Sequence, residues 1–241
     1  KKIKKSFFII LVVLIVLSGG SAIYLSNYYH SVDVEKYMNG SSEVSVEKFD
    51  KGWFFDGAGE EKALIFYPGA KVATEAYAPL MDQLAESGID CFLVDMPFHM
   101  AFFGMNRAEE IMQEYNYEEW YLGGHSLGGA MAANFAADYV EDHTDGIRGL
   151  LLLAAYPTKD LSTSDMSVVT VYGSEDGVLN MDKIVAGREL MPQDYKEVCI
   201  EGGNHAQFGS YGAQKGDGTA AIPAEEQWAR TVEVFVGDES E

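Results

Sequence analysis

The sequence predicts an α/β fold, with a mostly parallel sheet, an antiparallel hairpin at its start and helices on both faces. Three observations lead there. Strand-like and helix-like stretches alternate from residue 62 to 236. Most of the strand-like runs are apolar throughout, as expected for a parallel sheet covered on both sides. The 241 residues, 47% of them hydrophobic, suffice for one core and are too few for two ordinary domains. We therefore expect one catalytic domain at 43–241, a polar linker at 26–42 and a separate N-terminal segment at 1–25.

The N-terminal segment reads KKIKKSFFIILVVLIVLSGGSAIYL, with four lysines ahead of an apolar run. Counted to Leu25, the run has about twenty residues, the length that spans a bilayer. Counted to Leu17, it matches the core of a signal peptide, and the small residues at 20–22 would tolerate cleavage. The expectation is a single-pass membrane anchor with an extracytoplasmic catalytic domain, or a secreted protein if the segment is cleaved.

The charge of the chain argues against several partners. Its net charge is −21, and four of its 17 basic residues lie within the first five, so the rest carries 13 bases against 38 acids. Such an acidic body repels phosphate backbones, so we expect no nucleic-acid partner. No zinc-like spacing of His, Cys and Asp occurs, and neither a metal nor a cofactor is expected. Cys91 and Cys199 lie in apolar runs and are predicted to be buried, unpaired thiols.

The elements follow in order. The alternating stretch EVSVEKF (43–49) and the WFFDG stretch after Gly52 predict the hairpin. Strands are predicted at 62–69, 90–97, 117–124, 146–156, 167–173 and 194–203, and helices at 75–88, 106–115, 127–140, near 181–190 and at 225–236. Ligands of such sheets bind beyond the carboxyl ends of the strands, so we expect the site in the loops that follow them.

The stretch GGHSLGGAMAA contains a serine between two glycine pairs, in the pattern G-x-S-x-G. The pattern is short enough to arise by chance, and its context gives it weight: an apolar strand precedes it and a helix of small residues follows. Such a turn strains the serine backbone, and a Cβ at Gly124 or Gly128 would crowd the strand and the helix. Ser126 is therefore the predicted nucleophile.

The stretches FYPGAKV, GGHSLGGAMAA, YGSEDGV and GGNHAQFGSYG resemble the α/β-hydrolase family, and the resemblance runs through residues 62–236. It is strongest to the small bacterial families near the dienelactone hydrolases and carboxylesterases. The resemblance implies the α/β-hydrolase fold and a triad in the order Ser, then Asp or Glu, then His.

Two histidines follow the serine, His143 and His205. His143 lies in the charged loop EDHTDG, where a solvated side chain is expected. His205 follows an apolar strand and two glycines, at a carboxyl end of the predicted sheet, and is the predicted general base.

The acid should follow the strand SVVTVYG, which leaves Glu175 and Asp176. By the resemblance, the acid occupies the third position after Gly173, which selects Asp176, with Glu175 as the alternative. The oxyanion hole needs two backbone N–H groups. The residue after the nucleophile, Leu127, supplies one, and the resemblance assigns the other to Ala70 in FYPGAKV.

Substrate contacts are less defined. Lys71 could attract an acidic substrate, or be merely solvated. The apolar stretch MPFHMAFFGM predicts either an acyl pocket or core packing by Met96, Phe98, Met100, Phe102 and Phe103. About ten mostly polar residues join the strands ending near Tyr156 and beginning near Ser167, so no large lid domain is expected. The glycine-rich loop at 206–218 has no predicted role beyond holding the histidine.

Together these features predict a serine hydrolase that cleaves short-chain carboxylic esters through an acyl-enzyme intermediate. Its expected substrates are small molecules. The same triad could instead serve an acyltransferase or an amidase or peptidase. A catalytically inactive binding scaffold is the alternative from another class.

Overall fold

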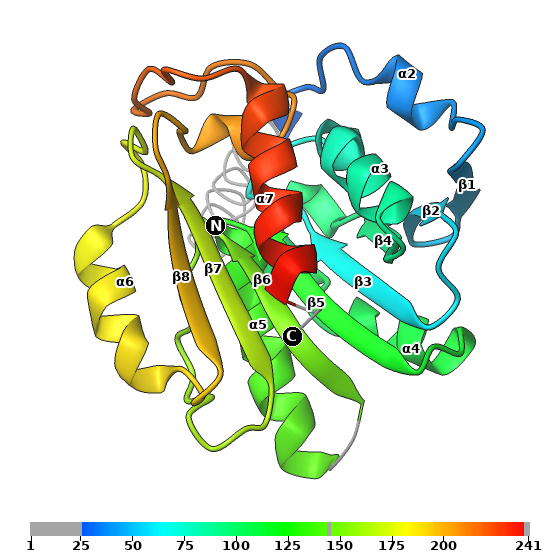
Figure 1. Cartoon of the computed structure of the whole chain (residues 1–241), viewed down its shortest axis with the longest axis vertical. Coiled ribbons are helices and arrows are strands. Elements are labelled where there is room, and N and C mark those ends of the chain that lie inside the picture. Colours follow the sequence, from blue (N-terminus) through cyan, green and yellow to red (C-terminus); the bar gives the residue numbers. More distant parts are fainter. Residues whose placement is uncertain (1–25, 144–145, 239–241) are drawn as a thin grey trace, which may run out of the picture.

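The computed structural model describes residues 26–143 and 146–238. In this part of the chain one sheet runs in the order β1-β2-β4-β3-β5-β6-β7-β8 (Figure 1). Its strands are β1 (Ser45–Phe49), β2 (Gly52–Asp56), β3 (Lys62–Tyr67), β4 (Asp90–Val94), β5 (Glu119–His125), β6 (Ile147–Leu153), β7 (Ser167–Gly173) and β8 (Tyr195–Ile200). The pairs β1–β2 and β2–β4 are antiparallel and the others are parallel. The predicted fold class, with its N-terminal hairpin, is confirmed.

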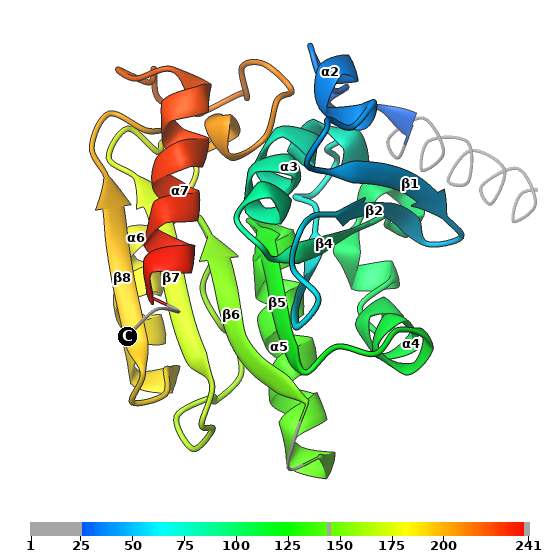
Figure 2. The same ribbon diagram turned by 45° about the vertical axis from the view of Figure 1, so that its right-hand side comes forward.

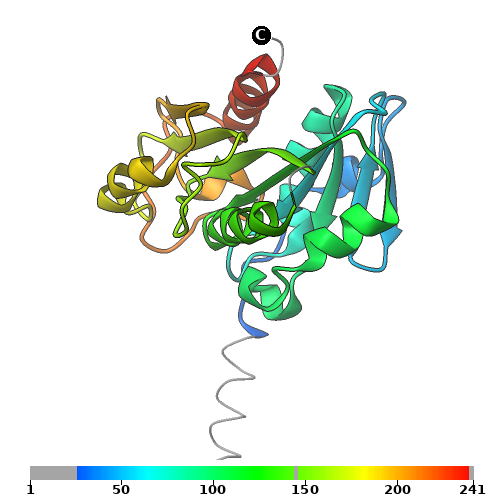
Figure 3. The same cartoon turned by 90° about the horizontal axis from the view of Figure 1, so that it is seen from below.

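Helices cover both faces of the sheet. They are α2 (Glu35–Met38), α3 (Ala78–Glu86), α4 (Arg107–Glu114), α5 (Leu127–Asp142), α6 (Met181–Gly187) and α7 (Ala224–Asp238), with short 3₁₀ helices η1 (Thr74–Tyr77), η2 (Pro97–His99), η3 (Ala101–Phe103), η4 (Arg188–Leu190) and η5 (Ala206–Phe208). Seen from below, α3 and α7 lie on one face and α4 and α5 on the other (Figure 3). The sheet between them is twisted, and the β1–β2 hairpin and β8 stand at its two ends (Figure 2).

Two hydrophobic cores explain why the central strands are apolar along their whole length. In β3, Leu64 and Phe66 belong to the core that includes side chains of α3 and α7. Ala63, Ile65 and Tyr67, which alternate with them, belong to the core that includes side chains of α4 and α5. Successive side chains of a strand point to opposite faces, so a strand covered on both faces has no polar side.

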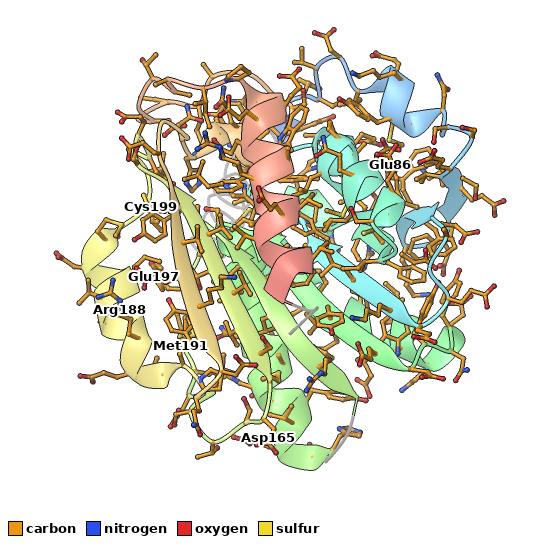
Figure 4. All side chains as sticks on the ribbon, viewed as in Figure 1. Glu86, Asp165, Arg188, Met191, Glu197 and Cys199 are labelled. Atoms are coloured by element: carbon orange, nitrogen blue, oxygen red, sulfur yellow. The ribbon has the colours of Figure 1, made fainter. Side chains whose placement is uncertain are left out.

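Strand β8 forms an edge of the sheet and is more exposed than the strands beside it. Arg188 and Glu197 pair there, with Nε and Nη2 donating to the carboxylate at 2.8 and 2.7 Å, and Cys199 lies on the same strand (Figure 4). The prediction of two unpaired thiols holds, but Cys199 is exposed and only Cys91 is buried. The expectation of burial was wrong for Cys199 because an apolar strand pattern does not reveal which strand is at the edge.

The predicted single-pass membrane anchor is not found in the part of the chain that the structure describes. The segment 1–25 that motivated it lies outside the described residues. Within 26–143 and 146–238, no helix has both the length and the apolar character needed to cross a bilayer.

The segment expected to be a linker contacts the loops at the carboxyl edge of the sheet. Tyr29 donates its N–H to the Lys71 carbonyl at 2.7 Å and accepts from the N–H of Ala73 at 2.8 Å. Val32 donates to the Ser210 carbonyl at 2.8 Å, and the Ser210 hydroxyl donates back to the Val32 carbonyl at 2.6 Å. Residues 29–32 therefore join the loop after β3 to the glycine-rich loop.

Candidate active site

The sheet order gathers the predicted site residues at one edge. β3 and β5 are neighbours, and so are β7 and β8, and all four run parallel. The loops after β3 and β5 therefore lie side by side, as do those after β7 and β8. The glycine-rich loop lies over the ends of β7 and β8 (orange in Figure 1). This is the edge at which α/β sheets bind ligands.

Ser126 occupies a strained turn between β5 and α5. Its φ of 55° and ψ of −121° fall in a region that residues with a Cβ rarely adopt. The turn is fixed from both sides, since the Ser126 N–H donates to the Leu153 carbonyl at 2.8 Å and its carbonyl accepts from Ala130 at 3.1 Å. A serine between a buried strand and a buried helix is thereby held at the carboxyl edge, half-exposed.

The neighbouring glycines are required by close backbone approach, as predicted. A Cβ on Gly124 would lie 2.6 Å from the backbone of Gly128 and Gly129. A Cβ on Gly128 would lie 2.1 Å from the Tyr67 carbonyl oxygen and 2.4 Å from that of Pro68. Helix α5 therefore begins against the end of β3, beside the loop expected to complete the oxyanion hole.

The predicted base and acid are hydrogen bonded to each other. His205 Nδ1 lies 2.8 Å from Asp176 Oδ2, and both side chains are 2% exposed. The other carboxylate oxygen, Oδ1, accepts the N–H groups of Val178 and Leu179 at 2.8 and 2.7 Å. Those two bonds fix the Asp176 carboxylate with Oδ2 directed at the imidazole.

The alternative acid and base lie elsewhere. Glu175 is exposed, and its carboxylate accepts a hydrogen bond from the Ser174 hydroxyl at 3.1 Å. His143 is exposed at the end of α5, stacked on Tyr139 with ring centroids 4.0 Å apart.

The free nitrogen of His205 lies next to the serine turn. The His205 ring is 4.5 Å, centroid to centroid, from the ring of His125, the residue before Ser126. Its Nε2 is buried and has no hydrogen-bond partner among the described residues, Ser126 Oγ included. A nucleophile–base bond is often long in the absence of substrate and tightens in the reacting complex.

The predicted oxyanion donor, Ala70, lies in the loop after β3 between two residues whose N–H groups are hydrogen bonded. Gly69 donates its N–H to the Tyr77 hydroxyl at 3.0 Å, and Lys71 donates to the His99 carbonyl at 2.7 Å. Between them, the Ala70 N–H donates to no group in the described part of the chain, and neither does that of Leu127. Both predicted donors thus remain uncommitted. Lys71 is half-buried with a φ of 59°.

Tyr77 and His125 form a buried pair that the sequence did not reveal. The Tyr77 hydroxyl accepts from Gly69 and lies 2.8 Å from His125 Nδ1. Burial raises the pKa of Tyr77, while burial and then the nearby His205 charge hold the pKa of His125 well below its ordinary value. This hydrogen bond links the residue before the predicted nucleophile to Tyr77, and through Tyr77 to Gly69 in the loop after β3.

Helix α7 fixes the residue before the predicted base. Gln227 is fully buried, and its side-chain oxygen accepts the Asn204 N–H at 3.0 Å while its nitrogen donates to the Asn204 carbonyl at 2.9 Å. Trp228 Nε1 donates to the Gln207 carbonyl at 2.7 Å. These contacts were also missed, because the partners lie more than twenty residues apart.

The predicted pocket residues divide into two groups. Met96 is buried in the core, and Met100 is half-buried. Phe98, Phe102 and Phe103 are 58, 67 and 55% exposed and stack edge to face. Beside them a cavity of about 410 Å³ opens at the carboxyl ends of β3 and β4, lined by Tyr28, Ala73, Thr74, Glu75, Asp95, Met96, Pro97, His99 and Arg107. In the described ranges no group of His, Cys, Asp and Glu is arranged to hold a metal ion.

The model of the family described as Alpha/beta hydrolase family matches residues 63–229. A search of curated protein sequences found no significant match.

Three solved structures illustrate the likeness of fold. Carboxyl esterase 2 from the fungus Tuber melanosporum is 13% identical, with a TM-score of 0.60, covering 86% of this chain and 91% of its own. A hydrolase from Agrobacterium vitis is also 13% identical, with a TM-score of 0.59 and 81% and 98% coverage. A thermostable esterase from Pseudomonas putida is 16% identical, with a TM-score of 0.57 and 85% and 84% coverage.

Proposed function

The chain belongs to the alpha/beta hydrolase family, and on that premise we propose that it is a serine hydrolase of carboxylic esters. The observation that carries the proposal is the buried 2.8 Å hydrogen bond between His205 and Asp176, next to a serine on a strained strand–helix turn. A buried carboxylate that orients a histidine, with a serine on such a turn, is the arrangement that serine hydrolases use.

The proposed reaction begins when the Ser126 hydroxyl attacks the ester carbonyl and His205 Nε2 accepts its proton. Asp176 holds the imidazole by Nδ1 and stabilises the imidazolium that forms. The N–H groups of Ala70 and Leu127 stabilise the negative charge on the carbonyl oxygen. The alcohol leaves with the proton from His205, and a water molecule, activated by the same histidine, hydrolyses the acyl-enzyme.

The choice of esters is supported by the similar folds, which include esterases from a fungus and a bacterium. The proposed acyl chain is short. The connection between β6 and β7, residues 154–166, contains no helix that could cover the site. The three exposed phenylalanines could shield a few carbons, but each further CH₂ left in water forgoes about 0.8 kcal/mol. We expect a preference for roughly two to six carbons.

The test uses p-nitrophenyl esters from acetate to palmitate, below micelle-forming concentrations, together with fluorophosphonate labelling. The wild type should hydrolyse short esters and take the label, and Ser126→Ala should do neither. Ser87→Ala is the matched control, because Ser87 is exposed at the end of α3 and bonds only its own helix. Activity retained in Ser126→Ala would refute the nucleophile. Rates that still rise beyond about ten carbons would refute the short-chain preference. Amide substrates and added acceptor alcohols separate hydrolysis of esters from the amidase and acyltransferase outcomes.

A further inference from the structure

Asp217, near the end of the glycine-rich loop, accepts four backbone N–H groups. Its Oδ1 accepts from Gly177 at 3.1 Å, His205 at 3.2 Å and Gly218 at 2.9 Å, and its Oδ2 accepts from Ala206 at 2.8 Å. A carboxylate that accepts this many N–H groups is held firmly, because several bonds from three segments of the chain fix its position.

Three of the four donors belong to the two loops that carry the proposed acid and base, and the fourth, Gly218, follows Asp217 in its own segment. Gly177 directly follows Asp176 in the loop after β7. His205 is itself the base, and Ala206 follows it in the loop after β8. One carboxylate from a third segment therefore bonds the backbone beside both members of the pair.

The third segment also packs directly against the acid loop. A Cβ on Gly218 would lie 2.0 Å from the Glu175 carbonyl oxygen, so this contact is between backbones. Asn204 donates its side-chain amide to the Gly218 carbonyl at 2.9 Å, which ties the same segment to the start of the histidine loop. Gly218, next to Asp217, thus contacts both the acid loop and the histidine loop.

We propose that Asp217 is a positioning residue, which couples the acid loop to the histidine loop and keeps Asp176 and His205 at hydrogen-bonding distance. The proposal rests on the proposed function of the same site. Asp217 does not touch the reacting atoms: its contacts are to backbone N–H groups, and the imidazole itself is bonded to Asp176. Loosening one loop relative to the other would lengthen that bond and misdirect Nε2, and small misplacements of a catalytic group are costly in rate.

Two substitutions separate the parts of this role. Asp217→Ala removes all four acceptor contacts. Asp217→Asn keeps one oxygen, which can still accept from Gly177 and His205, and replaces the other with an N–H₂ group that faces the Ala206 donor. Asp182→Asn is the control for lost charge, because Asp182 is exposed on α6.

The experiment measures kcat and KM for p-nitrophenyl acetate, and the downfield proton NMR signal of the His205–Asp176 hydrogen bond, in the full chain. Asp217→Ala should lower kcat on the order of 10² with KM within about twofold, and should broaden or remove the NMR signal. In Asp217→Asn the kcat should fall about tenfold, and in Asp182→Asn it should equal that of the wild type.

A wild-type kcat in Asp217→Ala would overturn the proposal. So would a loss of kcat with the NMR signal intact at a temperature where the variant is folded, because activity would then be lost by a route other than the His205–Asp176 bond. If Asp217→Ala does not fold, Asp217→Asn decides alone by the same two measurements. If the wild type hydrolyses no ester and Ser126 takes no fluorophosphonate, the proposed function fails, but the NMR signal and its loss in the variants still test the coupling.

Discussion

The serine turn and the acid–histidine side of the site are held in place by different forces. The turn, residues 123–129, is fixed by backbone packed against backbone, with no room for a Cβ at Gly124 or Gly128. The acid–histidine side is fixed by polar side chains: Asp217 and Gln227 bond backbone N–H groups of other loops, and Asp176 bonds those of its own loop. One half of the site is therefore set by steric contact between backbones, and the other by hydrogen bonds from polar side chains to backbone N–H groups.

The two kinds of constraint should fail differently. A backbone clash cannot be relieved by a rotamer change, so it moves whole segments. A hydrogen bond to a charged group contributes about 1.5–3 kcal/mol, and its loss leaves the rest of a network in place. Substitutions in the turn should therefore abolish the site, and substitutions on the other side should weaken it by degrees.

The largest effect is expected from Gly128→Ala. Its Cβ would lie 2.1 Å from the Tyr67 carbonyl, so α5 or the end of β3 has to shift, which moves both the serine and the loop after β3. Overpacking of this kind costs about 1–3 kcal/mol or more, and we expect no ester hydrolysis and a clearly lower Tm by circular dichroism.

The matched control is Gly237→Ala. Gly237 lies in α7, no described atom lies within 4 Å of a Cβ added there, and alanine is favoured in helices. This variant should keep its activity and a Tm at or slightly above that of the wild type. An active, stable Gly128→Ala would show that the turn is not sterically fixed and would remove the contrast between the two halves.

The acid–histidine side is tested at its centre by Asp176→Asn and Glu175→Gln. An amide at 176 can no longer orient and stabilise the imidazolium, so kcat should fall on the order of 10³–10⁴ while the Tm changes little. Glu175 is exposed and bonded only to Ser174 by its side chain, and its variant should retain wild-type kcat. If steady-state kinetics show a large loss of kcat in Glu175→Gln and none in Asp176→Asn, the catalytic acid is Glu175 instead.

The same contrast explains what the sequence could predict. The serine turn was predicted because its pattern, G-x-S-x-G, lies within five consecutive residues between a strand and a helix. The strand–helix order followed from hydrophobic patterns, which also act over short distances. The family resemblance, in turn, selected Asp176 and His205 from several acids and histidines.

What was missed depends on contacts between distant residues. Asp217 bonds Gly177 across forty residues, and Gln227 bonds Asn204 across twenty-three. Tyr77 reaches His125 across forty-eight. No local pattern marks one Asp, Gln or Tyr among many as the partner of a particular backbone group. The exposure of Cys199 was missed for a similar reason, because strand order is a property of the whole sheet.

The smallest effect concerns His125, which stands between the two halves: it precedes Ser126, bonds Tyr77 and contacts the ring of His205. Because its pKa is held well below 6.5, it stays neutral in the folded chain at a pH where the unfolded chain takes up a proton. The unfolded state then binds more protons, so the free energy of unfolding is unaffected above about pH 6.5 and falls as the pH drops below it.

One such group changes the free energy of unfolding by at most about 1.4 kcal/mol per pH unit. Urea unfolding from about pH 7.5 to about pH 5.5 should therefore show a steeper loss of stability in the wild type than in His125→Asn, whose amide oxygen can still accept from Tyr77. His99, whose pKa is lowered by partial burial, contributes to both proteins and cancels in the difference. His143→Asn, at an exposed site, should keep the wild-type slope. Equal slopes in the wild type and His125→Asn would mean that His125 takes up its proton inside the folded chain, and the buried Tyr77–His125 pair could not then be the neutral link between the serine turn and the oxyanion loop.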